Sequence, residues 1–246
     1  MVNQNKISEE KGLIIITCYN QCIEIEKVIN SCIALRRPET ILIVDDGSTD
    51  GSVEIIRKSG LQFISHTHNQ GVGAAIRTGL EYALKHDYSY IALVSGNGKS
   101  PPEFIKDLVD PILTNQADYT TGSRFIPGGS SPGLPLFRKI TIPIFSNIAS
   151  IILRRKFTDI TCGYRAYRLS FLMHASVHIS QSWLDRYELE YYLHYYACKL
   201  KLRIKEVPVT IKYDHLHKSR VSHIRVMHDG WSIIRTFLLL PLGLKK

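Results

Sequence analysis

The feature that most constrains the fold is a regular alternation of short apolar runs and helical segments up to about residue 113. Four bounded apolar runs predict buried strands, at residues 13–17, 39–46, 61–66 and 88–94. Segments with helical spacing or helix-opening residues follow them, at residues 24–36, 50–58, 69–86 and 101–113. Short links between these elements favour a mostly parallel sheet with helices on both faces. The expected fold class is therefore α/β and Rossmann-like.

The pattern after residue 120 is less regular. Residues 187–199 predict a helix rich in tyrosine, and residues 203–210 predict a further strand. No internal repeat, low-complexity tract or clear linker interrupts the chain. We expect residues 1–246 to form a single domain with its core at 12–235.

Charge is distributed unevenly along the chain. Residues 1–133 contain 12 Lys/Arg and 15 Asp/Glu, whereas residues 134–246 contain 19 Lys/Arg and 7 Asp/Glu. A strongly basic second half predicts contact with something anionic, such as a membrane surface, a phosphorylated substrate or nucleic acid. Nucleic acid is the weakest of these because only net charge supports it, and we expect no nucleic-acid partner.

Two apolar stretches in the basic half have membrane character. ITIPIFSNIASIIL at 140–153 lies between Arg138-Lys139 and Arg154-Arg155-Lys156, and SIIRTFLLLPLGLKK at 232–246 ends on lysines. Both are too short or too interrupted to predict a transmembrane helix. Each could lie in a lipid interface with its cations at the head groups, or be a buried helix with solvated ends. The fold prediction includes the second stretch as a C-terminal amphipathic helical segment.

Polar residues collect at the ends of the predicted strands, where ligands bind in parallel α/β sheets. The sharpest case is VDDGSTDGS at 44–52, where two carboxylates leave a strand and a turn leads into a helix. Those carboxylates could accept hydrogen bonds from ribose or base, although a capped strand–helix turn has the same residues. The glycine-rich NQGVGAAIRTG at 69–79 could face an anion or permit close packing, and it does not fit the dinucleotide fingerprint.

SGNGK at 95–99 follows the fourth strand, where such folds often place paired acids that hold a metal. Ser95 and Asn97 offer only neutral oxygens, and Lys99 adds a fixed positive charge. Neutral oxygens are weak ligands for Mg²⁺ or Mn²⁺, which prefer hard anionic oxygens.

Several motifs in order resemble those of family-2 glycosyltransferases, in the branch of dolichyl- and polyprenyl-phosphate sugar transferases. They are TCYNQ at 17–21, DDGSTDGS at 45–52, NQGVGAA at 69–75, PPE at 101–103, GSRF at 122–125, CGYRAY at 162–167, EVPV at 206–209 and KSRV at 218–221. The resemblance implies a GT-A fold with a nucleotide-sugar-binding half at 12–100 and an acceptor- or membrane-facing half at 101–246. It departs from the family pattern at Thr17, Gln21 and the SGNGK segment, where the family has proline, glutamate and D-x-D-G-Q.

The resemblance implies an inverting transfer from a nucleotide-diphospho-sugar to a polyprenyl phosphate or another glycan acceptor of the cell envelope. The donor would lie near Thr17, Tyr19, Asn20, Asp45, Asp46, Asn69, Gly71, Ser95 and Asn97. The implied divalent cation, Mg²⁺ or Mn²⁺, conflicts with the loss of D-x-D. Lys99 could replace the metal at the leaving diphosphate; alternatively, Asp46 with Asp45 or Asn97 could hold a weak ion, or donor could bind without turnover.

On the acceptor side, the candidate phosphate ligands are Arg124, Arg138 and Arg165, because arginine can bind phosphate through two hydrogen bonds. Asp159, Glu188 and Glu190 are the candidate bases, needed only when the acceptor is a hydroxyl. We expect a cytoplasmic enzyme, peripheral at the inner face of the cell membrane, with a membrane-protein partner as an option. The competing hypothesis is a catalytically silent nucleotide-sugar-binding module that serves a partner protein.

Overall fold

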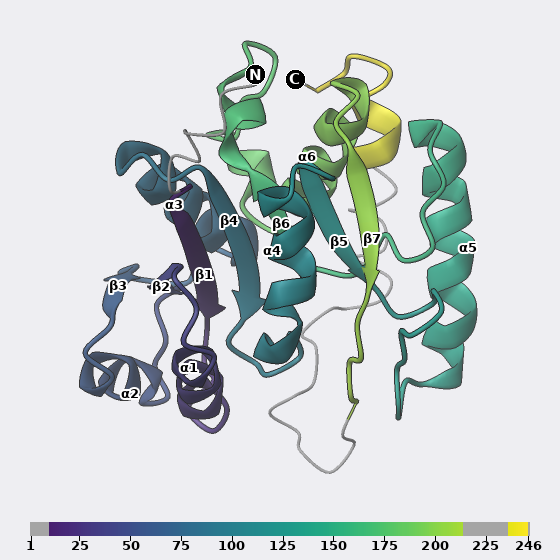
Figure 1. The fold of residues 1–246 in the computed structure, drawn as a ribbon. Helices are drawn as coiled ribbons and strands as arrows, with labels where there is room; N and C mark the ends of the chain where they lie inside the picture. Colours follow the sequence, from purple (N-terminus) through teal and green to yellow (C-terminus); the bar gives the residue numbers. More distant parts are fainter. Residues whose placement is uncertain (1–9, 214–235, 246) are drawn as a thin grey trace, which may run out of the picture.

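The computed structural model describes residues 10–213 and 236–245, and these residues share one seven-stranded mixed sheet (Figure 1). The order across the sheet is β3-β2-β1-β4-β6-β5-β7. The strands are β1 (Gly12–Cys18), β2 (Thr40–Asp45), β3 (Gln62–Ser65), β4 (Tyr90–Ser95), β5 (Tyr119–Ser123), β6 (Arg165–Arg168) and β7 (Ile204–Pro208). Only β6 runs antiparallel to its neighbours, so the α/β prediction is confirmed.

Helices cover both faces of this sheet (Figure 1). The α-helices are α1 (Ile25–Ala34), α2 (Ser52–Lys58), α3 (Val72–Lys85), α4 (Ile105–Leu113), α5 (Leu136–Leu153) and α6 (Glu188–Lys199). Short 3₁₀ turns occur at Pro102–Phe104, Leu169–Met173 and Ser182–Leu184. Alternate residues of β1 serve the two layers: Leu13 and Ile15 pack with α3 and α6, whereas Ile14 and Ile16 pack with α1 and α4. Burial on both faces explains the continuous apolar run of this strand.

The predicted elements of the first half are present with shifts of a few residues at their ends. The prediction did not include β5, β6 or the full length of α5. Strand β5 reads YTTGS and contains no large aliphatic residue, and β6 has only four residues. Neither segment carries the alternation or the aliphatic run that marks a strand in sequence.

Two sequence expectations fall wholly or partly beyond the described residues. KSRV at 218–221 lies outside them. Of the predicted C-terminal amphipathic segment, only 236–245 are described, and they begin with a helical turn. Phe237 in that turn packs edge-on against Tyr191 of α6.

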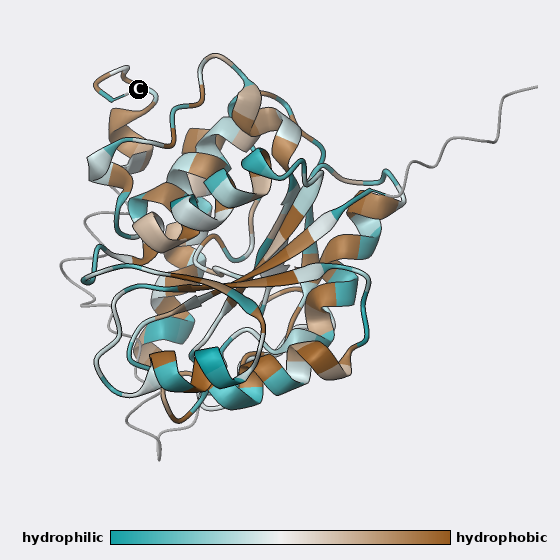
Figure 2. Cartoon of the chain, turned by 90° about the vertical axis from the view of Figure 1, so that its left-hand side faces the viewer, coloured by the Kyte–Doolittle hydropathy of each residue, from teal (hydrophilic) through white to brown (hydrophobic). Residues whose placement is uncertain are grey.

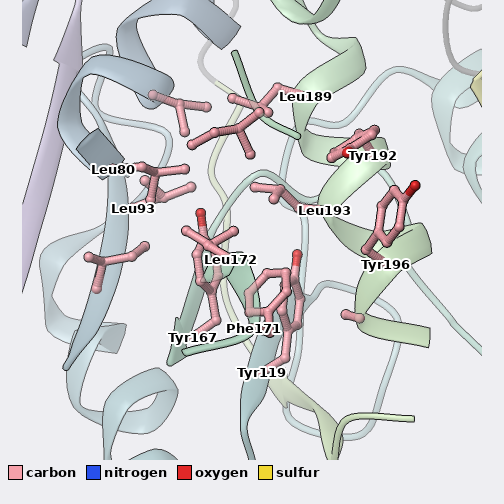
Figure 3. Close-up of a cluster of buried hydrophobic side chains, with 14 of the residues drawn as sticks. Leu80, Leu93, Tyr119, Tyr167, Phe171, Leu172, Leu189, Tyr192, Leu193 and Tyr196 are labelled. Carbon is pink, nitrogen blue, oxygen red and sulfur yellow. The ribbon is translucent and has the colours of Figure 1, made fainter. Parts of the chain in front are cut away.

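The larger of two core clusters lies between the sheet and α3 and α6, and aromatic rings dominate one end of it (Figure 3). Tyr119 and Tyr167 stack with their ring centroids 5.2 Å apart, and Phe171 packs edge-on against both. The hydropathy colouring in Figure 2 shows apolar strands crossing the middle of the molecule between helices of mixed character. Tyrosines of α6 are packing residues as well: Tyr192 and Tyr196 are buried, with ring centroids 4.6 Å apart, on the side of α6 away from Leu93 (Figure 3).

A fully buried histidine, His194, sits at the aromatic end of this cluster. Its Nδ1 lies 3.0 Å from the Tyr119 hydroxyl, and burial together with the nearby Arg165 charge lowers its pKa well below 6.5. Below pH 6.5, His194 becomes protonated in the unfolded chain but stays neutral in the folded chain. The free energy of unfolding therefore decreases as pH drops below that value.

We expect the free energy of unfolding to decrease by up to about 1.4 kcal/mol per pH unit below pH 6.5 because of His194. Urea unfolding at pH 7.0, 6.0 and 5.5 measures this slope. His194→Gln should flatten it, whereas His174→Gln, at an exposed position, should leave it unchanged. An identical slope in His194→Gln and the wild type would contradict the assignment.

Candidate active site

The carboxyl ends of β1, β2 and β4 bring the predicted donor residues to one edge of the sheet. Thr17 pairs with Val44 on one side and with Ser95 on the other, and Cys18 pairs with Asp45. The Gly96 amide donates to the Thr17 carbonyl at 2.8 Å, which draws the SGNGK turn against the end of β1. Three motifs far apart in the sequence therefore meet at this edge.

The DDGSTDGS loop is bonded to the loop that follows β1. Asn20 adopts a left-handed backbone conformation with a φ of 50°. Its Oδ1 accepts a hydrogen bond from the Thr49 amide, and its own backbone amide donates to the Ser48 hydroxyl. Asp45 is fully buried and accepts the Ser65 hydroxyl at 2.7 Å. Tyr19, between these bonds, stays exposed at this edge of the sheet. Asn20 and Asp45 thus fix the shape of the loops that surround Tyr19.

Asp46 joins the end of β2 to the loop after β3. Its Oδ1 accepts from the Gln70 amide at 2.9 Å and lies 2.7 Å from His66 Nδ1, while Oδ2 accepts from Asn69 Nδ2 and the Gly71 amide. An ionised carboxylate offers about four acceptor sites, so these four donors use them. The side chain is nearly fully buried. In this geometry Asp46 organises the loop at 66–71, and its predicted contact with a nucleotide or metal remains untested.

The glycines of NQGVG allow another segment to approach. A Cβ on Gly73 would lie 2.0 Å from the Leu184 carbonyl oxygen, and one on Gly71 would lie 2.4 Å from that of Asp185. The Ala74 amide donates to this same Asp185 carbonyl at 2.9 Å. The glycine-rich run therefore packs the segment before α6 onto the first turn of α3.

A polar pocket of about 390 Å³ lies where these two segments meet. Its lining residues are Gln70, Ser182, Trp183, Asp185, Arg186 and Glu188. The volume falls within the range of small-molecule sites. The pocket adjoins the loop that Asp46 organises, so it is a concave space next to the predicted donor residues.

The SGNGK turn folds back on itself. The Asn97 side-chain oxygen accepts the Lys99 amide at 3.0 Å, and Gly98, with φ of 71°, allows the tight turn. Within residues 10–213 and 236–245, no three side chains of His, Cys, Asp or Glu gather as a metal-binding group. Ser95 and Asn97 are neutral, and Asp46 already holds four donors. These residues do not fit a D-x-D-type metal site, so we derive no step through a metal.

Tyr213 connects the end of β4 with the end of β5. Lys99 Nζ lies 5.9 Å from the centre of its ring, within cation–π range, and Arg124 Nη1 donates to its hydroxyl. The sequence prediction missed Tyr213, because a single tyrosine after a strand carries no motif. Its position is the one signal: it follows β7 by a few residues, where parallel strands of the sheet end.

Arg124 and Asp159, predicted as phosphate ligand and base, are paired with each other. Arg124 Nε and Nη2 lie 2.6 and 2.7 Å from the two Asp159 oxygens, and both side chains are buried. Burial disfavours the charged guanidinium, but the bonds to Asp159 outweigh it and raise the pKa of Arg124. Glu206 of β7 holds the loop in turn by accepting the Thr158 and Asp159 amides. Arg124 and Asp159 therefore form a buried ion pair at the end of β5.

Arg165 and Glu190 form a second pair. Arg165 Nη1 lies 3.3 Å from Glu190 Oε1, and the arginine side chain is 1% exposed while that of Glu190 is 14% exposed. A Cβ on Gly163 would lie 2.8 Å from Glu190 Oε1, so glycine there makes room for the carboxylate. Of the two side chains, Glu190 is therefore the one that solvent can reach. Its direct contact with an acceptor phosphate stays a prediction, and the geometry favours a role in positioning Glu190.

Arg138, the third predicted phosphate ligand, lies in the first turn of α5. Among the described residues, no hydrogen bond or ion pair joins its side chain to the other candidate site residues. The structure therefore brings the candidates together as three groups: the Asp46 loop, the Lys99–Tyr213–Arg124–Asp159 group and the Arg165–Glu190 pair.

The fold is the GT-A fold of nucleotide-sugar glycosyltransferases. The chain superposes on glucosyl-3-phosphoglycerate synthase from Mycobacterium tuberculosis, solved with Mn²⁺, UDP and glucosyl-3-phosphoglycerate, with a TM-score of 0.68. That alignment has 17% identity and covers 97% of this chain and 82% of the other. Mannosyl-3-phosphoglycerate synthase from Rubrobacter xylanophilus superposes with a TM-score of 0.67 at 15% identity. That alignment covers 96% of this chain and 76% of the other.

The chain belongs to glycosyl transferase family 2, whose profile matches residues 13–175. It is 31% identical to undecaprenyl-phosphate mannosyltransferase from Micrococcus luteus over 85% of this chain and 87% of the relative. It is 28% identical to the UDP-N-acetylglucosamine–dolichyl-phosphate N-acetylglucosaminyltransferase of Methanococcus voltae, covering 94% and 96%. The protein is accordingly a glycosyltransferase, and the family prediction is confirmed.

Proposed function

We propose that the protein transfers a sugar from a nucleotide-diphospho-sugar to a polyprenyl phosphate, with inversion at the anomeric carbon. The names of full-length relatives support this donor and acceptor class, since they act on undecaprenyl or dolichyl phosphate. The observation that carries the proposal is the Lys99–Tyr213–Arg124 contact. This contact links Lys99, after β4, through Tyr213 to Arg124, after β5, which supports a role for Lys99 near the leaving diphosphate.

The donor binds, in this proposal, at the carboxyl ends of β1, β2 and β4. Tyr19 offers an exposed ring at this edge, and the loop at 66–71 borders the polar pocket. Asn20, Asp45 and Asp46 act indirectly, because their side chains already hold the loops that form the site. Preformed loops lower the entropy cost of ordering the donor.

The transfer itself needs charge balance more than a base. The bond between the anomeric carbon and the diphosphate oxygen breaks, and the nucleoside diphosphate leaves with the bonding electrons. The acceptor phosphate oxygen, already an anion, forms the new bond on the opposite face. Lys99 stabilises the negative charge of the leaving diphosphate in place of a metal. Arg165 holds Glu190 at the acceptor side, where the carboxylate would act as base only for a hydroxyl acceptor.

The cellular setting follows from the acceptor class. A polyprenyl phosphate resides in a membrane, so we propose a cytoplasmic enzyme, peripheral at the inner membrane face, that serves cell-envelope synthesis. The alternative is a catalytically silent nucleotide-sugar-binding module that serves a partner protein. It is favoured by the same SGNGK sequence, which lacks the family's acids.

One experiment separates the two functions. Purified protein is incubated with a panel of UDP- and GDP-sugars and with undecaprenyl phosphate in detergent, and nucleoside diphosphate and glycolipid are both quantified. We expect one donor to give equal amounts of the two products. Donor binding by calorimetry without either product would support the module. Nucleoside diphosphate released without glycolipid would reject the lipid acceptor while retaining the enzyme.

A further inference from the structure

The loop that follows β5 fixes the backbone of Tyr213. The Ile211 amide donates to the Ser130 carbonyl at 3.0 Å. Two residues further along, the Tyr213 amide donates to the Pro132 carbonyl at 2.8 Å. Gly133 has a φ of 74°, and a Cβ there would lie 2.1 Å from the Tyr213 carbonyl oxygen. Glycine at this position therefore allows the loop to lie directly against Tyr213.

The Tyr213 side chain meets one cation with its ring and another with its hydroxyl. Lys99 Nζ lies 5.9 Å from the ring centre, and Arg124 Nη1 donates to the hydroxyl oxygen. Arg124 is itself held in place, because its Nε and Nη2 lie 2.6 and 2.7 Å from the two Asp159 oxygens. Its Nη2 also donates to the Thr161 hydroxyl at 2.8 Å. The phenol oxygen therefore has a fixed donor on one side.

The direction of the Arg124 bond determines what the phenol hydroxyl can still do. A guanidinium carries only hydrogen-bond donors, so the hydroxyl oxygen accepts from Arg124 and its own proton is directed to a different group. Among residues 10–213 and 236–245, this hydroxyl donates no hydrogen bond. Tyr213 is only partly buried, so a bound ligand can supply the hydrogen-bond acceptor.

The phenol keeps this proton at neutral pH. Burial raises the pKa of Tyr213 above its ordinary value, although the Arg124 charge lowers it in part. A hydroxyl that accepts from a cation is polarised and becomes a stronger donor. Phosphate oxygens suit such a donor, because hydrogen bonds to an ionised acceptor are stronger than those to a neutral one. The proposed transfer brings two such groups to the site: the diphosphate of the donor and the phosphate of the polyprenyl acceptor.

We propose that the Tyr213 hydroxyl binds substrate by donating a hydrogen bond to a phosphate oxygen. Arg124 polarises and orients this hydroxyl, and Lys99 adds a positive charge beside the same ring. Tyr213 keeps its proton throughout, so the nucleoside diphosphate still leaves as an anion. The inference rests on the proposed function, since that function supplies the phosphate groups. It adds a neutral donor whose removal leaves both cations in place.

The test is isothermal titration calorimetry of the Tyr213→Phe variant and the wild type with UDP, with GDP and with undecaprenyl phosphate in detergent. The substitution removes the hydroxyl and retains the ring beside Lys99. We expect the variant to bind the phosphate ligand that the hydroxyl contacts about 10–100-fold more weakly, as for a lost hydrogen bond to a charged group.

The matched control is Tyr195→Phe on α6. Lys199 Nζ lies 5.6 Å from the Tyr195 ring centre, and the Tyr195 hydroxyl donates to the Leu240 carbonyl. Tyr195 thus has a lysine beside its ring and a bonded hydroxyl, as Tyr213 does, but lies outside the three groups of candidate site residues. This control should bind every ligand with wild-type affinity.

The pattern of losses identifies the phosphate. Weaker binding of UDP or GDP assigns the hydroxyl to the donor diphosphate, and weaker binding of undecaprenyl phosphate assigns it to the phosphate of the sugar acceptor. Wild-type affinity of Tyr213→Phe for all ligands that the wild type binds overturns the inference and leaves the proposed function intact. Losses accompanied by a lower melting temperature show a structural hydroxyl and also overturn it. A wild type that binds none of the ligands rejects the proposed function and the inference together.

Discussion

Replacing Lys99 with alanine is expected to slow donor turnover roughly 10²–10³-fold, the usual loss when one preorganised donor to a developing negative charge is removed. The lysine is the fixed cation at the end of β4, next to the Tyr213 ring, where the family pattern would place a metal-binding acid pair. Release of nucleoside diphosphate measures the effect. Lys106→Ala, at an exposed lysine of α4, is the control and should keep wild-type rates.

The same hypothesis makes turnover independent of added metal. We expect wild-type activity to persist in excess EDTA, and Ser95→Asp combined with Asn97→Asp to introduce metal binding in competition with Lys99. The hypothesis fails if EDTA abolishes wild-type activity and Mg²⁺ or Mn²⁺ restores it. That outcome would indicate an ion held by the donor diphosphate together with an acid such as Asp46.

Arg124→Ala is expected to lower the free energy of unfolding by about 3–5 kcal/mol, because it leaves the buried Asp159 carboxylate without its charge partner. The substitution also removes a donor to Tyr213 and to Thr161. Sequence reasoning alone would treat Arg124 as a ligand whose loss spares the fold. The structure predicts that stability is lost together with activity. Urea unfolding monitored by circular dichroism gives the measurement.

The control for this prediction is another arginine–aspartate pair. Arg203 contacts Asp118 through Nη2 at 2.6 Å, but the arginine side chain is 49% exposed. Arg203→Ala should therefore lower the free energy of unfolding far less than Arg124→Ala does. Equal losses in Arg124→Ala and Arg203→Ala would show that burial of the Arg124 pair adds no stability, contrary to the prediction.

Aliphatic runs made the first half of the fold predictable. β1, β2 and β4 each contain an unbroken run of four Ile, Leu, Val or Ala residues, so the pattern predicts these strands and a mostly parallel sheet. β5 and β6 were not predicted because they bury polar side chains, such as Thr120, whose hydroxyl donates to the Leu108 and Ala166 carbonyls. A polar residue with a buried partner is indistinguishable in sequence from one that faces water.

The location of the candidate site could be predicted from the sequence, but the contacts among its residues could not. The strand ends at Asp45 and Ser95 lie where topology requires them. The ionic partners depend on tertiary geometry: Asp159 is separated from Arg124 by the whole of α5, and Glu190 meets Arg165 only after α6 packs on β6. Motif resemblance identified the two arginines as phosphate ligands and the two acids as bases, because it carries no information about burial.

The position of β7 next to β5 imposes an order on assembly during synthesis. β1 to β4 and the Asp46 loop lie within the first 95 residues, so a growing chain can pair these strands while the remainder is still being translated. β5 can pair with β6 first, but its other side stays unpaired until β7, more than 80 residues later, and the Asp159 loop must wait for Glu206. A ribosome-bound chain can thus hold the paired strands β1 to β4 while the other side of the sheet is incomplete, and a fragment stalled before Glu206 would lack the bonds that hold the Asp159 loop.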